Sequence, residues 1–520
     1  MRRRLVIPLD MLLGLLLSLL AVAAAYAVAD RVFERLAHLE DEQAFIWQAQ
    51  VLARGKLTLP SPPNSASFLW PFVVDYGGQR FGKYPLGWPL VLSIGESLDI
   101  RAWVNPLLAG LGVWLTFLLG KRVFGSASGL LAAALTITSP FFLMQSGSLL
   151  SHPLGLVLSA AFVLAWLESF ATGDEPAATV SESKKRWASI LAGLALGALA
   201  ITRPWTAVGV ALPFALHGLY LLVRGDRSMR QRLLITGAIT LAIASLQLLW
   251  QWIATGDPFQ NLYTLWWPYD KVGFGPGHGV KETGHTLSKA IRHLKLGFKG
   301  GFPELFGWKS LSWIFLPFGL LAALRLPRRL PALLVAAPFF SLCFVHLAYW
   351  VGSYVLGPRY YYEGLYSLTI YSAAGIALLA GWPISGILRP TPGTWRARLA
   401  IPRSVLVGLL LACLLTYNLT QYLPQRLESL HGLYGISRAP MEPFLSEQAQ
   451  QLAPALVIVH TQKKWVEYGT LLELQSPFLD SAFIFVFGPK VEDAIAESFP
   501  ERRIIHYYPD EPDKFYTQPR

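Results

Sequence analysis

Long apolar runs and short polar segments alternate along the chain from Leu5 to Tyr422. Most runs approach the roughly 20 apolar residues that a helix needs to cross a bilayer, and a helix satisfies its own backbone hydrogen bonds in lipid. The pattern predicts a polytopic α-helical membrane protein with about eleven spanning helices. We expect these helices near residues 5–29, 103–120, 126–144, 150–168, 187–202, 205–223, 233–254, 311–324, 331–351, 360–381 and 404–422.

Lysine and arginine are distributed unevenly between the loops that join these runs. Cytoplasmic loops carry an excess of such residues. One set of loops is rich in them, namely Arg2–Arg4, Lys121–Arg122, Lys184–Arg186, Arg224–Arg232, Arg325–Arg329 and Arg389–Arg403. The short loops on the other side hold only Arg203 and Arg359. The asymmetry places the N-terminus in the cytoplasm.

The same alternation predicts three large extracytoplasmic segments, at residues 30–102, 255–310 and 424–520. The segment at 255–310 holds seven basic residues, but long loops follow the charge rule weakly. Ala25-Tyr26-Ala27 in the first apolar run is compatible with a signal-peptidase site. The run is long enough to span the bilayer, so we favour an uncleaved anchor.

The composition agrees with a membrane protein. Hydrophobic residues make up 53% of the chain and charged residues only 15%, with a mean hydropathy of +0.42. The net charge of +12 lies mostly in short loops, as membrane topology requires, and we expect no nucleic-acid partner. Cys343 and Cys413 both fall inside apolar runs, which offers neither a disulfide framework nor a metal-binding spacing.

Three polar segments carry shorter elements. A helix is expected to begin near Leu39, because Phe45, Ala49 and Leu52 recur at helical spacing. The apolar piece at 88–98 is too short to span and should lie in the interface. Residues 287–299 combine an apolar stripe with a basic face, which suits anionic headgroups or a phosphate-linked lipid.

The tail at 424–520 changes character. Residues 455–459, 483–487 and 503–507 are typical of buried strands, and 491–498 of a short helix. We therefore predict two domains, a transmembrane domain at 1–423 and a small extracytoplasmic α/β domain at 424–520.

The predicted topology gathers unusual ionisable residues on the outer face. Asp41 and Glu42 open the first-loop helix, where acids also have a simple structural role at the helix dipole. His152 begins a helix and can serve as a cap. Arg203 can extend to lipid headgroups, whereas Arg359 beside three tyrosines suits phosphate binding.

A second candidate site lies in the loop at 275–285. His278, Glu282 and His285 fall within eight residues and could ligate a metal ion. Their spacing matches no strong zinc pattern.

Several short motifs resemble one known family. Asp41-Glu42, Lys83-Tyr84-Pro85, Ser151-His152-Pro153, Thr202-Arg203-Pro204 and Arg359-Tyr360 occur in this order. Together they resemble the GT-C membrane glycosyltransferases, in particular the group containing protein O-mannosyltransferases and lipid A aminoarabinose transferase. The resemblance covers about residues 5–422.

The resemblance implies a transferase that uses a polyprenyl-phosphate-linked sugar, hexosyl or pentosyl, as its donor. It also implies a location in the plasma membrane of a bacterium, with the active site at the extracytoplasmic face. Asp41 would be the catalytic base or a metal-binding acid, with Glu42 and His152 as further catalytic candidates. His152 occupies a place where the family often has a second acid, which leaves open both the divalent metal and the identity of the base. Substrate-binding roles are implied for Lys83, Tyr84, Arg203, Arg359 and Tyr360.

The chemistry of the residues agrees with this resemblance. Arginines can pair a donor phosphate, and a carboxylate can take the proton of an acceptor hydroxyl on a lipid, glycan or protein. The alternatives are a transporter or flippase of lipid-linked sugars, and a non-catalytic assembly protein. A transporter favours ionisable groups near the membrane midplane in two related halves, whereas here the ionisable residues cluster at one face.

Overall fold

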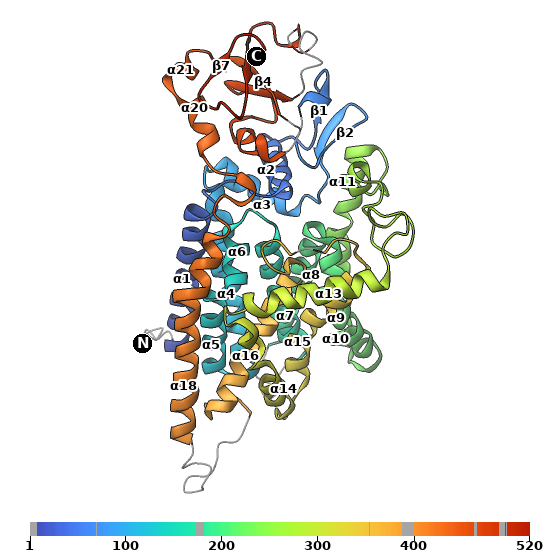
Figure 1. Cartoon of the computed structure of the whole chain (residues 1–520). Coiled ribbons are helices and arrows are strands. Elements are labelled where there is room, and N and C mark those ends of the chain that lie inside the picture. The colour runs from blue at the N-terminus through green and yellow to red at the C-terminus, as the bar shows by residue number, and fades with distance from the viewer. Residues whose placement is uncertain are drawn as a thin grey trace, which may run out of the picture.

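Most helices of the computed structural model run side by side in a bundle, and a small sheet lies beyond one end of that bundle (Figure 1). The structure describes residues 8–520 except 69, 172–180, 353, 387–399, 462–464, 488–494 and 496. The basic residues predicted in the cytoplasmic loops at Arg2–Arg4 and at 389–398 lie outside the described part.

The number of candidate spans agrees with the prediction. Among the described residues, nine helices are long and apolar enough to cross a membrane, or up to eleven if each of two bent pairs is one span. The main spans are α1 (Leu9–Arg31), α4 (Arg101–Phe124), α7 (His152–Phe170), α8 (Glu182–Thr202), α9 (Pro204–Arg224), α10 with α11 (Arg227–Ala244, Leu246–Thr255), α15 (Leu330–Val345), α16 (Leu365–Ala380) and α18 (Ala400–Tyr417).

Two predicted spans, at 126–144 and 311–324, belong to bent pairs of helices. The run at 126–144 forms α5 (Ser126–Ile137) and α6 (Pro140–Gly147), which meet at 61°. Ser139 caps α6 by accepting a hydrogen bond from the Phe142 amide, and Pro140 suits the first helical position. The segment with an apolar stripe and a basic face forms α13 (Leu287–Glu304). It is followed by η2 (Lys309–Trp313) and α14 (Leu316–Leu324), and the two parts meet at 99°.

The first large loop contains a small sheet that the apolar pattern did not predict. After α2 (Glu40–Ala53) come β1 (Leu59–Pro60), β2 (Val73–Tyr76) and β3 (Gln79–Gly82), in the order β1-β3-β2. Gly77 and Gly78 both have positive φ and form the two-residue turn between β2 and β3. The apolar piece at 88–98 forms the short helix α3 (Gly87–Ser97).

The C-terminal region contains the three predicted strands with the predicted bounds. They are β4 (Ala455–Val459), β5 (Phe483–Phe487) and β6 (Arg503–Tyr507), and they are parallel. A short β7 (Phe515–Tyr516) adds an antiparallel edge to give the order β5-β4-β6-β7. The helix predicted at 491–498 lies largely outside the described residues.

This C-terminal sheet packs on the first large loop (Figure 1). Side chains of α2 such as Trp47 and Val51 share one apolar cluster with residues of β4 and β5. Polar contacts reinforce the packing, because Arg101 Nη2 lies 2.5 Å from Glu473 Oε2 and the Gln43 amide donates to the Gly469 carbonyl. The beginning of α2 is therefore enclosed between the bundle and the C-terminal region.

Candidate active site

A cavity of about 740 Å³ lies where the first large loop, the bundle and the C-terminal region meet. Its walls come from segments that are far apart in the sequence. Seven of the residues that the sequence singled out line it, namely Asp41, Lys83, Tyr84, His152, Arg203, Arg359 and Tyr360. The cavity is large enough for a small organic group such as a sugar.

Asp41 lies in the first turn of α2 and contacts both an arginine and a tyrosine. Its Oδ2 is 3.0 Å from Arg359 Nη2, and its Oδ1 accepts a hydrogen bond from the Tyr84 hydroxyl. Burial acts to raise the pKa of the Asp41 carboxyl, but Arg359 and Tyr84 outweigh it and hold the pKa below its ordinary value. The carboxylate is therefore ionised at neutral pH.

Glu42 lies behind Asp41 and outside the described cavity wall. Its carboxylate accepts three backbone hydrogen bonds, from Leu149 at 2.7 Å, from His38 at 2.8 Å and from Leu39 at 3.0 Å. Burial raises its pKa to about 7, although the three amides oppose that shift. These contacts join the start of α2 to the α6–α7 connection, so the geometry fits a positioning residue.

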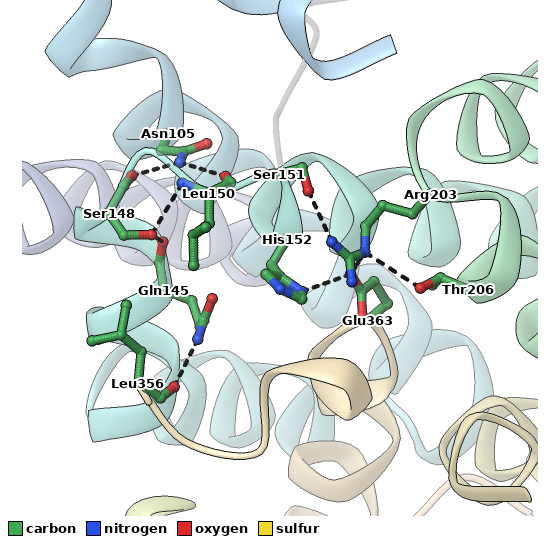
Figure 2. A network of polar contacts seen from close by, with 10 residues as sticks. All are labelled: Asn105, Gln145, Ser148, Leu150, Ser151, His152, Arg203, Thr206, Leu356 and Glu363. Carbon is green, nitrogen blue, oxygen red and sulfur yellow. Dashed lines mark hydrogen bonds and ion pairs between the residues drawn. The ribbon is translucent and has the colours of Figure 1, made fainter. Parts of the chain in front are cut away.

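His152 and Arg203 converge on one buried acid, Glu363 (Figure 2). Its Oε1 lies 3.0 Å from His152 Nδ1 and 2.9 Å from Arg203 Nε. Arg203 also donates to the Ser151 hydroxyl at 2.9 Å. Glu363 belongs to η4 (Arg359–Gly364), which leads into α16.

The sequence interpretation did not include Glu363 among the candidates. A signal was present, because Glu363 follows Arg359 by one helical turn at the mouth of an apolar run. An acid in such a place is costly unless it is paired.

The connection between α6 and α7 is held from several sides. The Asn105 side-chain amide of α4 donates to the carbonyls of Ser148 and Leu150, at 2.6 and 2.9 Å (Figure 2). The indole of Trp88 donates to the Leu149 carbonyl at 3.0 Å. These contacts satisfy the backbone of a turn that carries His152 into the cavity wall.

Lys83 occupies an aromatic enclosure with one acid. Its Nζ lies 3.5 Å from Asp270 Oδ2, and 3.7 and 4.5 Å from the ring centres of Phe72 and Trp267. Burial lowers the pKa of Lys83, and Asp270 opposes that shift. Asp270 is held in turn by the Tyr349 hydroxyl and the indole of Trp350, and it too was missed from the sequence.

The predicted metal sites do not fit the geometry of these residues. Within the described part of the chain, no three His, Cys, Asp or Glu side chains gather as ligands, and His278, Glu282 and His285 are no exception. His285 Nε2 lies 2.9 Å from the Leu347 carbonyl. Asp41 faces a guanidinium and His152 faces Glu363, so neither presents the donor set of a divalent cation. No metal-dependent step is derived from these positions.

The sequence and the fold both resemble known transferases. The family described as "Oligosaccharyl transferase STT3, N-terminal" matches residues 89–260. None of the curated proteins compared with the chain matches it. The fold is similar to the crystal structure of ArnT from Cupriavidus metallidurans bound to undecaprenyl phosphate, with a TM-score of 0.57, 14% identity, and coverage of 94% of this chain and 89% of that chain.

A second solved structure shows the same architecture. The apo oligosaccharyltransferase of Archaeoglobus fulgidus aligns with a TM-score of 0.51 and 14% identity, over 91% of this chain and 64% of that chain. The predicted region of resemblance, residues 5–422, is about four-fifths of the chain, so coverage above 90% extends the structural similarity into the C-terminal region. The chain spans a smaller share of the archaeal protein than of ArnT.

Proposed function

This chain has the GT-C fold of membrane glycosyltransferases, and we propose that it transfers a sugar from a polyprenyl-phosphate-linked donor to an acceptor hydroxyl. One observation carries the proposal: Asp41 and Arg359 are in direct contact in the wall of a cavity that also contains Lys83 and Arg203. The solved ArnT structure with bound undecaprenyl phosphate supports a lipid phosphate as the anionic partner.

The donor phosphate has two kinds of partner in the cavity. Arg359 Nε and Nη1 are buried without a hydrogen-bond partner among the described residues, and buried polar groups of this kind call for one. A phosphate oxygen can accept a charge-assisted hydrogen bond from either nitrogen. Lys83 adds a second cation to the cavity wall, with its Nζ 5.2 Å from the centre of the Tyr84 ring.

The transfer step needs a base for the acceptor and a stabilised leaving group. The acceptor oxygen forms a bond to the anomeric carbon, and the bond between that carbon and the phosphate oxygen breaks with its electron pair. The proton of the acceptor hydroxyl passes to Asp41, and Arg359 stabilises the departing polyprenyl phosphate. Tyr84 orients Asp41 through its hydrogen bond.

We place this site on the extracytoplasmic face of a bacterial plasma membrane, with residues 424–520 as a separate domain on that side. The alternation of basic loops supports this orientation. Cysteines introduced at Ser65 and Ser476 should react with an impermeant maleimide in intact cells. Labelling of either position only after permeabilisation would reverse the orientation.

The activity is tested with purified protein in nanodiscs and a panel of undecaprenyl-phosphate sugars. We expect release of undecaprenyl phosphate from at least one donor, and loss of that release in Arg359→Gln. Donor translocation between leaflets of proteoliposomes without cleavage would instead indicate a flippase, and would overturn the proposal.

A further inference from the structure

Two aromatic side chains of the C-terminal region complete the wall of the cavity. Tyr434 and Trp465 line it together with Glu40 and Asp41 of α2. Their ring centres are 6.2 Å apart and their planes meet at 63°. Neither residue belongs to the predicted transmembrane domain, and neither takes part in the ion pairs described above.

Helix α2 holds Trp465 close to Asp41. Trp465 packs so closely on Gly469 that a Cβ there would lie 2.7 Å from the indole ring. The Gly469 carbonyl accepts from the Gln43 side chain at 3.0 Å, and Gln43 follows Asp41 by two residues. The position of Trp465 relative to Asp41 therefore depends on direct contacts between the two segments.

Tyr434 is held in an unfavourable backbone conformation. Its φ and ψ are 59° and 21°. These angles lie in the left-handed region, which residues other than glycine, asparagine and aspartate rarely adopt. The residue is nevertheless 47% exposed, so burial does not explain the conformation. Strain of this kind persists where the surroundings impose it and often accompanies a binding role.

The segment that carries Tyr434 is anchored to the end of α1. The Arg438 backbone amide donates to Glu34 Oε2 at 2.8 Å, and His431 Nε2 lies 3.3 Å from Glu34 Oε1. These contacts bracket Tyr434 on both sides in the sequence. The exposed ring is therefore presented to the cavity by a fixed segment.

We propose that Tyr434 and Trp465 form a stacking surface for a carbohydrate acceptor. Sugar rings have C–H faces that pack on the negative faces of aromatic rings, while their hydroxyl edges donate hydrogen bonds to carboxylates such as Glu40 and Asp41. An aliphatic lipid chain would instead favour a continuous aliphatic wall. This inference rests on the proposed function and specifies the acceptor as a glycan hydroxyl.

Saturation-transfer NMR on the full-length protein in nanodiscs tests the proposal. The probes are methyl α-mannoside, methyl β-galactoside and methyl β-N-acetylglucosaminide, with an acetylated serine tripeptide as the competing class of acceptor. We expect at least one glycoside to bind, and Trp465→Ala to weaken it by roughly three- to ten-fold. Tyr76→Ala is the matched control, because Tyr76 is 43% exposed but does not line the cavity.

Tyr434→Gly separates binding from folding. Glycine adopts positive φ without strain, so this variant should keep or raise the thermal midpoint while it weakens glycoside binding. Equal glycoside binding by wild type and both variants, or binding of the tripeptide alone, would overturn the proposal.

Release of undecaprenyl phosphate, measured on the same samples, distinguishes the two proposals. Donor cleavage without glycoside binding would remove the carbohydrate acceptor and leave the transferase in place. Trp465-dependent glycoside binding without cleavage of any donor would contradict the proposed function, and with it the assignment of the bound sugar as an acceptor.

Discussion

Replacing Asp41 by Asn tests whether this carboxylate is the base of the reaction or only the counter-ion of Arg359. Asparagine keeps an oxygen that can accept from Tyr84, but it loses the charge that faces Arg359 at 3.0 Å. The base hypothesis predicts a fall in kcat of about a hundred- to ten-thousand-fold. That loss corresponds to about 3–5 kcal/mol of transition-state stabilisation.

The same substitution has a cost in stability. Breaking a fully buried ion pair costs about 3–5 kcal/mol. The side chains of Asp41 and Arg359 are 24% and 15% exposed, so solvent compensates in part and we expect about 1–3 kcal/mol. The thermal midpoint should fall modestly while the protein remains folded.

Donor affinity separates the two roles of Asp41. Removing the carboxylate frees Arg359 for the donor phosphate, so the donor should bind as tightly as before or more tightly in both cases. Only the base hypothesis predicts that kcat falls strongly while donor affinity is kept or increased. The assay measures donor affinity and release of undecaprenyl phosphate in nanodiscs.

Two comparisons make the result specific. Asp99→Asn is the same substitution at an exposed position outside the cavity wall. It should leave donor affinity and the release of undecaprenyl phosphate unchanged. Glu40→Gln removes a neighbouring acid that does line the cavity. Turnover of Asp41→Asn within ten-fold of wild type, with donor binding intact, would refute the assignment of Asp41 as the base.

Three further predictions concern other residues around the cavity. Glu363→Gln should lower the free energy of unfolding by about 1–3 kcal/mol, because it leaves Arg203, whose side chain is 17% exposed, without its carboxylate; an unchanged thermal midpoint would contradict this. Arg359→Lys keeps the charge but loses the planar fork, so donor affinity should fall about ten-fold in a folded protein, and unchanged donor kinetics would remove Arg359 from the site. Burial raises the pKa of Glu42 from 4.5 to about 7, so the contribution of Glu42 to stability is present below pH 4.5 and is lost as pH rises through about 7. The thermal midpoint of the wild type should therefore decline between these two pH values. The Glu42→Gln variant should lack this decline.

The spanning helices were predictable because apolar length is a property of contiguous residues. The buried strands at 455–459 and 483–487 were predictable for the same reason. The bend between α5 and α6 was missed, although Ser139-Pro140 is a recognisable helix start. Apolar residues lie on both sides of these two residues, so the pattern predicted one continuous helix and not two. Strands β1 to β3 have two to four residues each, too few for an alternating pattern.

Seven of the candidate residues lie in the wall of one cavity, but the sequence did not predict how they pair. The topology rule brings Asp41, Arg203 and Arg359 to one face, because loops on one side must share that side. Which acid faces which cation depends on how distant helices and loops pack. Asp270 and Glu363 therefore escaped notice, since nothing in the local sequence links them to Lys83 or Arg203.

Ion pairs between cations and carboxylates determine the electrostatics of the cavity wall. The cavity wall contains three cations, and each of them faces one carboxylate. Arg359 faces Asp41, Lys83 faces Asp270, and Arg203 faces Glu363. A cluster of unpaired cations in a buried wall would be costly before the donor arrives, and the acids remove that cost. An incoming phosphate must then compete with a carboxylate for each cation. Arg359 is the best suited of the three to such exchange, because two of its buried nitrogens have no hydrogen-bond partner among the described residues. Donor binding at Arg359 would loosen the hold on Asp41 and so raise its proton affinity at the moment when a base is needed, which couples occupation of the donor site to activation of the acceptor.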